Sequence, residues 1–326
     1  MSGGHLSDAE RNALLGAAIA APSIHNTQPW LFRLGKDTVD VFADPSRQLT
    51  SQDPEGRAMV ISCGAALLNL RVAAEQLGHA AHVEVLPDAG STDLIARIRL
   101  GGVHPRAGMT GELYSAIAAR RTNRGPYEDR PIPSPMLHAL VEAAQLEGAE
   151  LHLVHSADER ERLVKLMHTA DSETYGDPGL EGEAEQWIGV GTDRNDGIPK
   201  DALGPVPDDS HMPYRDLEHG RPHSGRSVAR FEEAPTLAVL TTPRDTRADW
   251  VTAGQALERV LLVATIEGLS ATFANQPLEQ PSLRWLVRDP DEPIGYPQMI
   301  MRLGYGQPVP PTPRRDVAEV VVTGDP

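Results

Sequence analysis

The sequence contains one cysteine, Cys63, in 326 residues, which excludes an internal disulfide and any metal site built from several cysteines. Aromatic residues make up only 4 % of the chain, so the core must rest on leucine, valine, isoleucine and alanine. Uninterrupted apolar runs are short: residues 14–22 read LLGAAIAAP, against the roughly 20 residues that a membrane span requires. The N-terminal residues show no basic stretch followed by a long apolar one, which is the pattern of a secretory signal. We therefore expect a cytoplasmic protein without a membrane partner.

Positive charge is also scarce, because 46 acidic residues oppose 30 lysines and arginines and give a formal net charge of −16. A field of that sign repels nucleic acids and anionic membranes, so neither is expected as a partner. An anionic small molecule can still bind where arginines are concentrated. Local clusters of arginine are therefore informative.

Several common catalytic motifs are missing. The chain has no GxGxxG fingerprint and no GxxxxGK[ST] loop, which argues against a Rossmann dinucleotide site and a P-loop. It has no GxSxG elbow, which leaves serine hydrolase chemistry without support. Gly220 and Pro222 preclude a helical pair of metal ligands in the region that holds three histidines. Those histidines are His211, His219 and His223.

An internal repeat organises the chain. Residues 64–78 (GAALLNLRVAAEQLG) align without a gap with residues 254–268 (GQALERVLLVATIEG). Both segments are apolar nearly all round, which is typical of a buried helix. Residues 12–18 (NALLGAA) match residues 138–144 (HALVEAA) in the same way. The order of a surface helix followed by a buried helix therefore occurs twice, with a large insertion in the second copy.

Short segments that read as strands surround these helices, and some follow one another directly, which favours an α+β fold. The predicted strands are 31–34, 38–43, 82–86, 94–100, 150–155, 236–242, 271–274 and 299–303. We predict two pseudo-equivalent halves, residues 1–105 and 106–326. The turn-rich residues 176–230 form the insertion, and a segment of that length is either disordered or a functional lid. We favour a lid, anchored by Trp187, Ile198 and Tyr214.

The segment after the first helix, residues 21–30, reads APSIHNTQPW. Pro22 and Ser23 end the helix and open a turn, and the proline after Gln28 forces that residue into an extended conformation. Trp30 can anchor the turn in the core. We expect a stiff loop that holds the Asn26 and Gln28 amides outward, where they suit a flat heterocycle with alternating N–H and C=O groups. An ordinary helix-to-strand connection with a capping asparagine remains the alternative.

A second motif, RRTNR, follows a predicted helix over 112–119 and concentrates positive charge. Guanidinium groups bind phosphate through forked, charge-assisted hydrogen bonds, and a threonine hydroxyl adds a further donor. Favourable placement of cations at a helix C-terminus is an equally good explanation of the motif alone. A later pair, Arg314 and Arg315, could reach the same anion. The residues of the motif are Arg120, Arg121, Thr122, Asn123 and Arg124.

A third motif, GLSATFANQP at 268–277, follows the second buried helix. A strand that ends at Asn275 and Gln276 can direct a backbone N–H into a cleft.

Together these motifs resemble the FMN-dependent nitroreductase superfamily, through APSxxNxQPW, RRTxR, a buried helix ending in GL, and a late LGYG followed by PRR. The resemblance is closest to the fused mycobacterial Acg-like members and covers nearly the whole chain apart from the insertion. The residues that it implies for the FMN phosphate are Arg120, Thr122 and Arg124, with Arg314 or Arg315 assisting. Those that it implies for the isoalloxazine and ribityl are Pro22, Ser23, Asn26 and Gln28. The backbone near Asn275 would lie by flavin N5.

The chain departs from ordinary members of that superfamily, which are homodimers with RRSxR and PSxxNxQPW in every subunit. Here the first half has the loop without a preceding RRSxR. The second half has RRTNR, but residues 145–150 read QLEGAE where its loop should follow. Each half keeps what the other lacks. We infer a pseudo-dimer within one chain, with one competent flavin site and one vestigial position.

The resemblance implies an FMN-binding oxidoreductase that takes a hydride from NADH or NADPH and passes electrons to nitroaromatic or quinone-like acceptors by a ping-pong mechanism. No side chain is assigned as a catalyst, because the flavin carries the chemistry. The alternative is a protein that stores or sequesters FMN under a closed lid, and a flavin-free scaffold is a third reading. The expected partner is a small-molecule electron acceptor, and the chain is expected to be a monomer or a weak homodimer.

Overall fold

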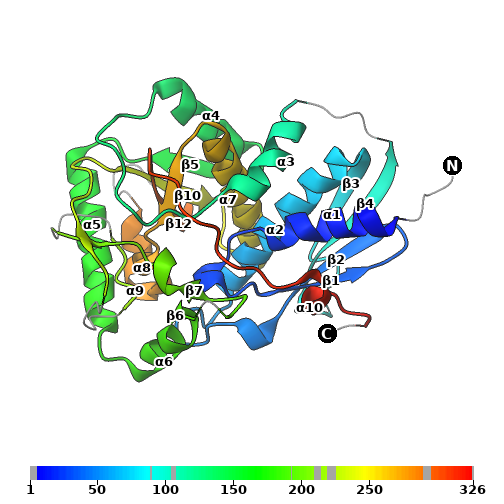
Figure 1. Cartoon of the computed structure of the whole chain (residues 1–326), viewed down its shortest axis with the longest axis horizontal. Helices are drawn as coiled ribbons and strands as arrows, with labels where there is room; N and C mark the ends of the chain where they lie inside the picture. Colours follow the sequence, from blue (N-terminus) through cyan, green and yellow to red (C-terminus); the bar gives the residue numbers. More distant parts are fainter. Residues whose placement is uncertain are drawn as a thin grey trace.

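The computed structural model describes residues 6–88, 90–103, 108–191, 193–208, 214–218, 225–288 and 295–324. It contains two four-stranded antiparallel sheets, one on each side of a central pair of long helices (Figure 1). The three histidines of the insertion and the predicted boundary at residue 105 lie outside the described residues.

The first half builds one sheet whose strands run in the order β1-β2-β4-β3. Its helices and strands are α1 (Asp8–Ile19), β1 (Trp30–Leu34), β2 (Thr38–Ala43), α2 (Arg57–Gln76), β3 (His79–Val85) and β4 (Leu94–Val103). Ser7 and Glu10 form a capping box that starts α1, and the loop after this helix holds a short 3-10 turn, η1 (Ile24–Asn26). Trp30 is fully buried, as predicted for the anchor of that loop.

The second half repeats this arrangement. Its sheet has the strand order β11-β12-β10-β5. Matched in chain order, β5, β10, β11 and β12 correspond to β1, β2, β3 and β4, and the two sheets then have the same strand order. The elements are α3 (Thr110–Ala119), α4 (Ser134–Gln145), β5 (Glu150–Leu153), β10 (Thr236–Thr242), α7 (Arg247–Ile266), β11 (Ser270–Phe273), α8 (Gln276–Glu279), α9 (Pro281–Arg284), η4 (Trp285–Val287) and β12 (Tyr296–Gly304). The predicted α+β fold and the predicted strands are confirmed, with ends that differ by a few residues.

The two helices of the sequence repeat, α2 and α7, pack against each other at the centre of the molecule (Figure 1). They approach each other closely at Gly64 and Gly254, which are equivalent positions of the repeat. A Cβ atom added at Gly64 would lie 2.4 Å from the Val251 carbonyl oxygen, and one at Gly254 would lie 2.1 Å from the Ile61 carbonyl oxygen. Only glycine permits backbones to come this close. One continuous apolar core therefore includes both halves.

The insertion between β5 and β10 is longer than residues 176–230. The first half joins its equivalent strands through residues 35–37 alone, whereas the second half adds α5 (Ala157–Thr174) and α6 (Pro178–Trp187) between them. Short strands follow, namely β6 (Ile188–Val190), β7 (Ile198–Pro199), β8 (Val206–Pro207) and β9 (Val228–Ala229). The sequence of α5 has the periodicity of an ordinary helix, so it gave no indication that this helix belongs to the insertion. Trp187 and Ile198 are buried, as predicted for anchors of this segment, and Tyr214 is half-buried.

The C-terminal segment crosses from the second half to the first. After β12 the chain runs over the middle of the molecule and ends at α10 (Val317–Val320), beneath α1 and β1 (Figure 1). Val322 donates a backbone hydrogen bond to the Phe32 carbonyl at 2.9 Å, which fixes the segment on the first sheet. This crossing carries Arg314 and Arg315 to the loop after α1.

Among the described residues one helix, α2, is long and apolar enough to cross a membrane, with a mean hydropathy of 1.4 over its most apolar window. That window is 83 % buried inside the protein, where α2 packs against α7.

Candidate functional site

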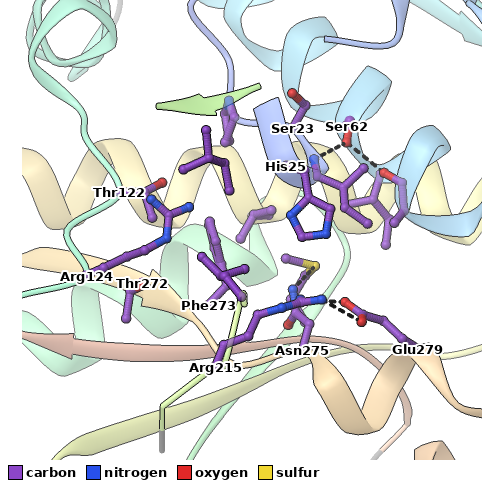
Figure 2. Close-up of a pocket in the computed structure, with 18 of the residues that line it drawn as sticks. Ser23, His25, Ser62, Thr122, Arg124, Arg215, Thr272, Phe273, Asn275 and Glu279 are labelled. Atoms are coloured by element: carbon purple, nitrogen blue, oxygen red, sulfur yellow. Dashed lines mark hydrogen bonds and ion pairs between the residues drawn. The ribbon is translucent and has the colours of Figure 1, made fainter. Parts of the chain in front are cut away.

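A cavity lies between the two halves. Its volume is about 1020 Å³ when the space open to solvent at its mouth is included. The loop after α1, the start of α2, the RRTNR segment, the strand ends of the second sheet and the insertion all contribute to its wall (Figure 2). The polar and charged residues that line it are Ser23, His25, Arg57, Ser62, Thr122, Arg124, Tyr214, Arg215, Thr272, Asn275, Glu279 and Arg302. Apolar walls with a few convergent polar groups, as here, are typical of small-molecule and cofactor sites.

The loop after α1 presents Pro22, Ser23 and His25 to this cavity. His25, Asn26 and Gln28 all have positive φ, at 44°, 56° and 50°, a conformation that residues other than glycine rarely adopt. The predicted extended conformation of Gln28 is therefore wrong. Local hydrogen bonds hold this strained backbone: the Gln28 N–H donates to Ser23 Oγ at 2.9 Å, and the Ile24 N–H donates to Ser62 Oγ at 3.3 Å. Strain of this kind concentrates at binding sites.

The prediction that Asn26 and Gln28 point their amides outward is wrong. Gln28 is fully buried; its amide nitrogen donates to the Asn195 carbonyl at 2.9 Å, and its oxygen accepts the Arg315 N–H at 2.7 Å. The Asn26 amide nitrogen donates to the Gly197 carbonyl at 2.9 Å. These amides fasten the insertion and the C-terminal segment to the loop, and neither residue lines the cavity.

Two arginines that are distant in sequence meet behind this loop. Arg120 is buried and donates from Nη2 to the Ala20 carbonyl at 3.0 Å, and Arg314 donates to the same carbonyl at 3.3 Å. Arg314 also donates to Asn26 Oδ1 at 3.0 Å. Burial, together with the positive charge of Arg120, lowers the pKa of Arg314 to about 9. The fold therefore brings Arg120 of the RRTNR motif and Arg314 to the loop after α1, although both lie behind the cavity wall.

The other residues of the RRTNR motif lie in different surroundings. Arg121 donates to the Ala118 and Arg120 carbonyls at the surface. Thr122 and Arg124 line the cavity, because Thr122 forms a β-bridge with Ala271 at the end of the second sheet (Figure 2).

Arg124 has no carboxylate within 4.0 Å among the described residues and donates only to the Ala202 carbonyl, at 2.9 Å. Burial, and the neighbouring cation Arg215, lower its pKa to about 10. A half-buried cation of this kind gains from an anionic ligand.

The third motif is split by the fold. Asn275 lines the cavity, and its Oδ1 accepts the Ile300 N–H at 2.7 Å. Gln276 turns away from the cavity and donates from its amide to the Tyr214 carbonyl at 3.0 Å. Arg315 is also turned away, and its guanidinium donates to the Gln28 and Glu319 carbonyls. Of the twelve residues proposed from the sequence, the cavity wall contains Pro22, Ser23, Thr122, Arg124 and Asn275.

A row of hydrogen-bonded polar side chains, which no sequence motif indicated, runs along one side of the cavity. His25 Nε2 lies 2.7 Å from Gln52 Oε1, and the Gln52 amide nitrogen donates to Glu279 Oε2 at 2.8 Å. Glu279 in turn forms a bidentate ion pair with Arg215, at 2.6 and 2.8 Å (Figure 2). This row of side chains connects the loop after α1 with α8 and the insertion. These residues come from four separate parts of the sequence, so no motif marks them.

Metal chemistry has no support in the described part of the chain, where no group of three His, Cys, Asp or Glu residues could hold an ion. Cys63 is fully buried in α2 and donates to the Pro29 carbonyl at 3.2 Å. Burial raises the pKa of its thiol well above the ordinary value, so it is an inert core residue as predicted.

Known proteins resemble this chain in sequence. A family model described as the nitroreductase family matches residues 117–305. The Mycobacterium tuberculosis protein named "Putative NAD(P)H nitroreductase Rv3131" is 33 % identical over 97 % of this chain and 92 % of its own length. A second protein of that organism, "Putative NAD(P)H nitroreductase acg", is 28 % identical over 93 % of this chain and 92 % of its own length.

Solved structures that resemble the chain cover part of it. The FMN-dependent nitroreductase NfnB from Mycobacterium smegmatis, solved in complex with NADPH, is 17 % identical and matches 67 % of this chain and 100 % of its own, with a TM-score of 0.41. A nitroreductase with bound FMN from Bacteroides fragilis is 20 % identical over 60 % of this chain and 89 % of its own, with a TM-score of 0.37.

Proposed function

Since the chain belongs to the nitroreductase family, we propose that it binds one FMN in the cavity between its halves and reduces a small electron acceptor with NADH or NADPH. The observation that carries the proposal is that three motifs far apart in sequence supply Ser23, Arg124 and Asn275 to one cavity. When bound, FMN would supply hydride-transfer chemistry between the nicotinamide and a nitroaromatic or quinone-like acceptor.

The residues fit the cofactor in charge and in polarity. Arg124 offers a half-buried guanidinium with no carboxylate within 4.0 Å among the described residues, and Thr122 offers a hydroxyl donor. Arg120 and Arg314 lie behind them and extend the positive region toward Ala20. Pro22 and Ser23 face the cavity from the opposite half, where they would contact the flavin ring and ribityl. In a protein of net charge −16, this concentration of cations favours an anionic ligand.

We propose further that the chain is an intramolecular pseudo-dimer with halves 1–105 and 106–326. The shared strand order and the glycine contact between α2 and α7 support two fused copies related by approximate two-fold symmetry. The copies differ at the site. The loop that holds Pro22 and Ser23 has no counterpart after α4, where residues 146–149 turn directly into β5. A single flavin per chain, a monomer or weak homodimer, and a cytoplasmic location are parts of this proposal.

The insertion supports a second candidate, a protein that stores FMN with little or no turnover. Ile198, Tyr214, Arg215 and Leu217 extend from the insertion over the cavity, and the Arg215–Glu279 ion pair holds this cover against α8. A cover that stays closed would keep FMN in and keep NAD(P)H out.

Anaerobic addition of NADH or NADPH to the flavin-loaded protein separates the two candidates. Turnover requires that the nicotinamide reach the flavin, so we expect the flavin absorption near 450 nm to bleach within seconds for an oxidoreductase. The absorption spectrum is followed before and after each reductant, with dithionite as the control that the flavin is reducible. A flavin that dithionite bleaches and NAD(P)H leaves oxidised over minutes would favour storage, and protein that stays colourless after FMN is supplied would end both proposals.

Removal of the ion pair tests the role of the insertion as a cover. Arg215→Ala breaks a pair whose side chains are each 14 % exposed, and charge-assisted pairs of this kind contribute about 1.5–3 kcal/mol. We expect FMN to dissociate roughly 10-fold faster, measured by the recovery of free-flavin fluorescence after dilution. The control is Arg230→Ala, which removes an exposed ion pair with Glu233 in the same insertion. Equal dissociation rates in both variants would show that the Arg215 contact does not hold the cover.

A further inference from the structure

A second cavity adjoins the first at the start of α2. Its volume is about 1070 Å³ when the space open to solvent is included, and it shares Arg57, Ala58 and Glu279 with the wall of the first cavity. The loop before α2, the ends of α8 and α9, η4 and the start of β12 contribute to the rest of its wall. None of the sequence motifs that point to a flavin supplies a residue to it. The two cavities are therefore neighbours with a common boundary.

Two exposed aromatic side chains line the second cavity and are absent from the wall of the first. Trp285 is 65 % exposed and Tyr296 is 42 % exposed. The Arg288 guanidinium lies 5.4 Å from the centre of the Tyr296 ring. Large aromatic rings that remain in water at a cavity leave apolar surface for a flat ligand to cover. This wall therefore favours a planar aromatic ligand.

Arg57 supplies a cation at the boundary between the cavities. It is 7 % exposed and donates from Nη1 to the Gln298 carbonyl at 2.8 Å and from Nη2 to the Leu278 carbonyl at 3.1 Å. Its Nε donates to none of the described residues, and no carboxylate among them lies within 4.0 Å of the guanidinium. Burial lowers the pKa of Arg57 to about 10, so the group stays cationic at neutral pH. An anionic ligand in the cavity would supply its first close opposite charge.

The other charges of the second cavity favour an anion with a single charge. Three of the carboxylates in its wall already have partners. Asp53 accepts two backbone N–H groups at the start of α2, at 3.0 and 2.9 Å. Asp245 pairs with Arg284 at 2.7 Å, and Glu279 pairs with Arg215 at 2.6 Å. These carboxylates would repel a dianion about twice as strongly as a monoanion. A carboxylate, planar and singly charged, therefore suits the unused donors of Arg57 better than a phosphate does.

We propose that the second cavity binds a planar aromatic carboxylate, with the carboxylate on Arg57 and the ring against Trp285 and Tyr296. The site lies beside the cavity assigned to FMN and goes beyond the proposed function, because no residue of the flavin motifs takes part in it. Since Arg57 belongs to both walls, the carboxylate of the ligand lies at the boundary between the two cavities.

Isothermal titration calorimetry of the whole protein with 2-naphthoate tests the ligand class. We expect 2-naphthoate to bind roughly 10-fold more tightly than 2-naphthalenemethanol, which has the same rings and no charge to pair with Arg57. Adenosine 5′-monophosphate, a planar base with a phosphate of nearly two negative charges, should bind more weakly than 2-naphthoate. Equal affinity for the acid and its alcohol, or a preference for the monophosphate, would overturn the proposed ligand class.

Trp285→Ala tests the location of the site. Loss of this ring should weaken 2-naphthoate binding roughly 3–10-fold, and the fold should persist because the side chain is mostly in solvent. Tyr175→Ala is the matched control, since this ring is 47 % exposed and lines neither cavity. Equal affinities in the two variants would overturn the location, as would 2-naphthoate binding that added FMN abolishes, because such competition would place the ligand in the first cavity.

Arg57→Gln tests the cation and should remove the preference for the acid over the alcohol. Arg57 also holds the Gln298 and Leu278 carbonyls, so this variant could fail to fold by circular dichroism. The second variant is then Arg57→Lys, which keeps the charge but loses the planar fork, and the preference should fall severalfold. An unchanged preference in the variant that folds would overturn the role of Arg57. Protein that binds 2-naphthoate as expected but never binds FMN would support this inference and end the proposed function.

Discussion

Replacement of Arg124 by alanine is expected to weaken FMN binding about 100-fold, which corresponds to roughly 3 kcal/mol. The guanidinium lines the cavity, has no carboxylate within 4.0 Å among the described residues, and is held in place by the Ala202 carbonyl. An anionic group of the ligand would therefore be its first opposite charge. The dissociation constant, measured by quenching of flavin fluorescence on titration with apoprotein, checks the prediction.

The design of this experiment depends on what each arginine contacts. Arg130→Ala is the matched control, because this arginine is exposed and stacks on Tyr305 outside the cavity. Arg120→Ala is a poor substitute for Arg124→Ala, since it would leave Glu258 buried without its nearest cation and destabilise the fold. An FMN affinity of Arg124→Ala within threefold of the unaltered protein would exclude Arg124 from the site.

Gly254→Val is expected to destabilise the whole protein by about 3 kcal/mol or to prevent folding. A Cβ atom at this position would lie 2.1 Å from the Ile61 carbonyl oxygen and 2.7 Å from Gly64 Cα, and both neighbours are backbone atoms of α2. The helices could separate only if the core that joins the two halves opened. The free energy of unfolding from urea titration, followed by circular dichroism, measures the effect.

Gly16→Ala provides the control within the same chain. Gly16 is exposed on α1, and a Cβ atom added there meets nothing within 4 Å. Alanine costs less conformational entropy than glycine in a helix, so this variant should gain roughly 0.5–1 kcal/mol. A loss of similar size in both variants would indicate a general sensitivity of the helices to substitution, and a stable Gly254→Val would mean that α2 and α7 do not meet at these glycines.

Much of the fold followed from local pattern. The repeat between residues 64–78 and 254–268 predicted two equivalent buried helices, and the alternation of apolar residues predicted the strands that form the two sheets. The buried role of Trp30 and the inertness of Cys63 also followed from neighbouring residues. These features depend on side-chain periodicity and on backbone preferences within a few residues, which a sequence displays directly.

The orientation of individual polar groups depended on tertiary structure. Asn26 and Gln28 were predicted to be exposed because turn residues usually are exposed. In the structure their side chains form hydrogen bonds with the insertion and the C-terminal segment, which are more than 160 residues away in sequence. Nothing in the sequence distinguished Glu258 from the other residues of an apolar helix. Only the tertiary structure places it near Arg120 and Arg314.

The sequence by itself determined the two-half α+β architecture and which motifs carry positive charge. Tertiary structure alone decided which of those residues reach the cavity and which are used internally. The physical reason is that a buried donor, acceptor or charge must find a partner, and that partner can come from any part of the chain.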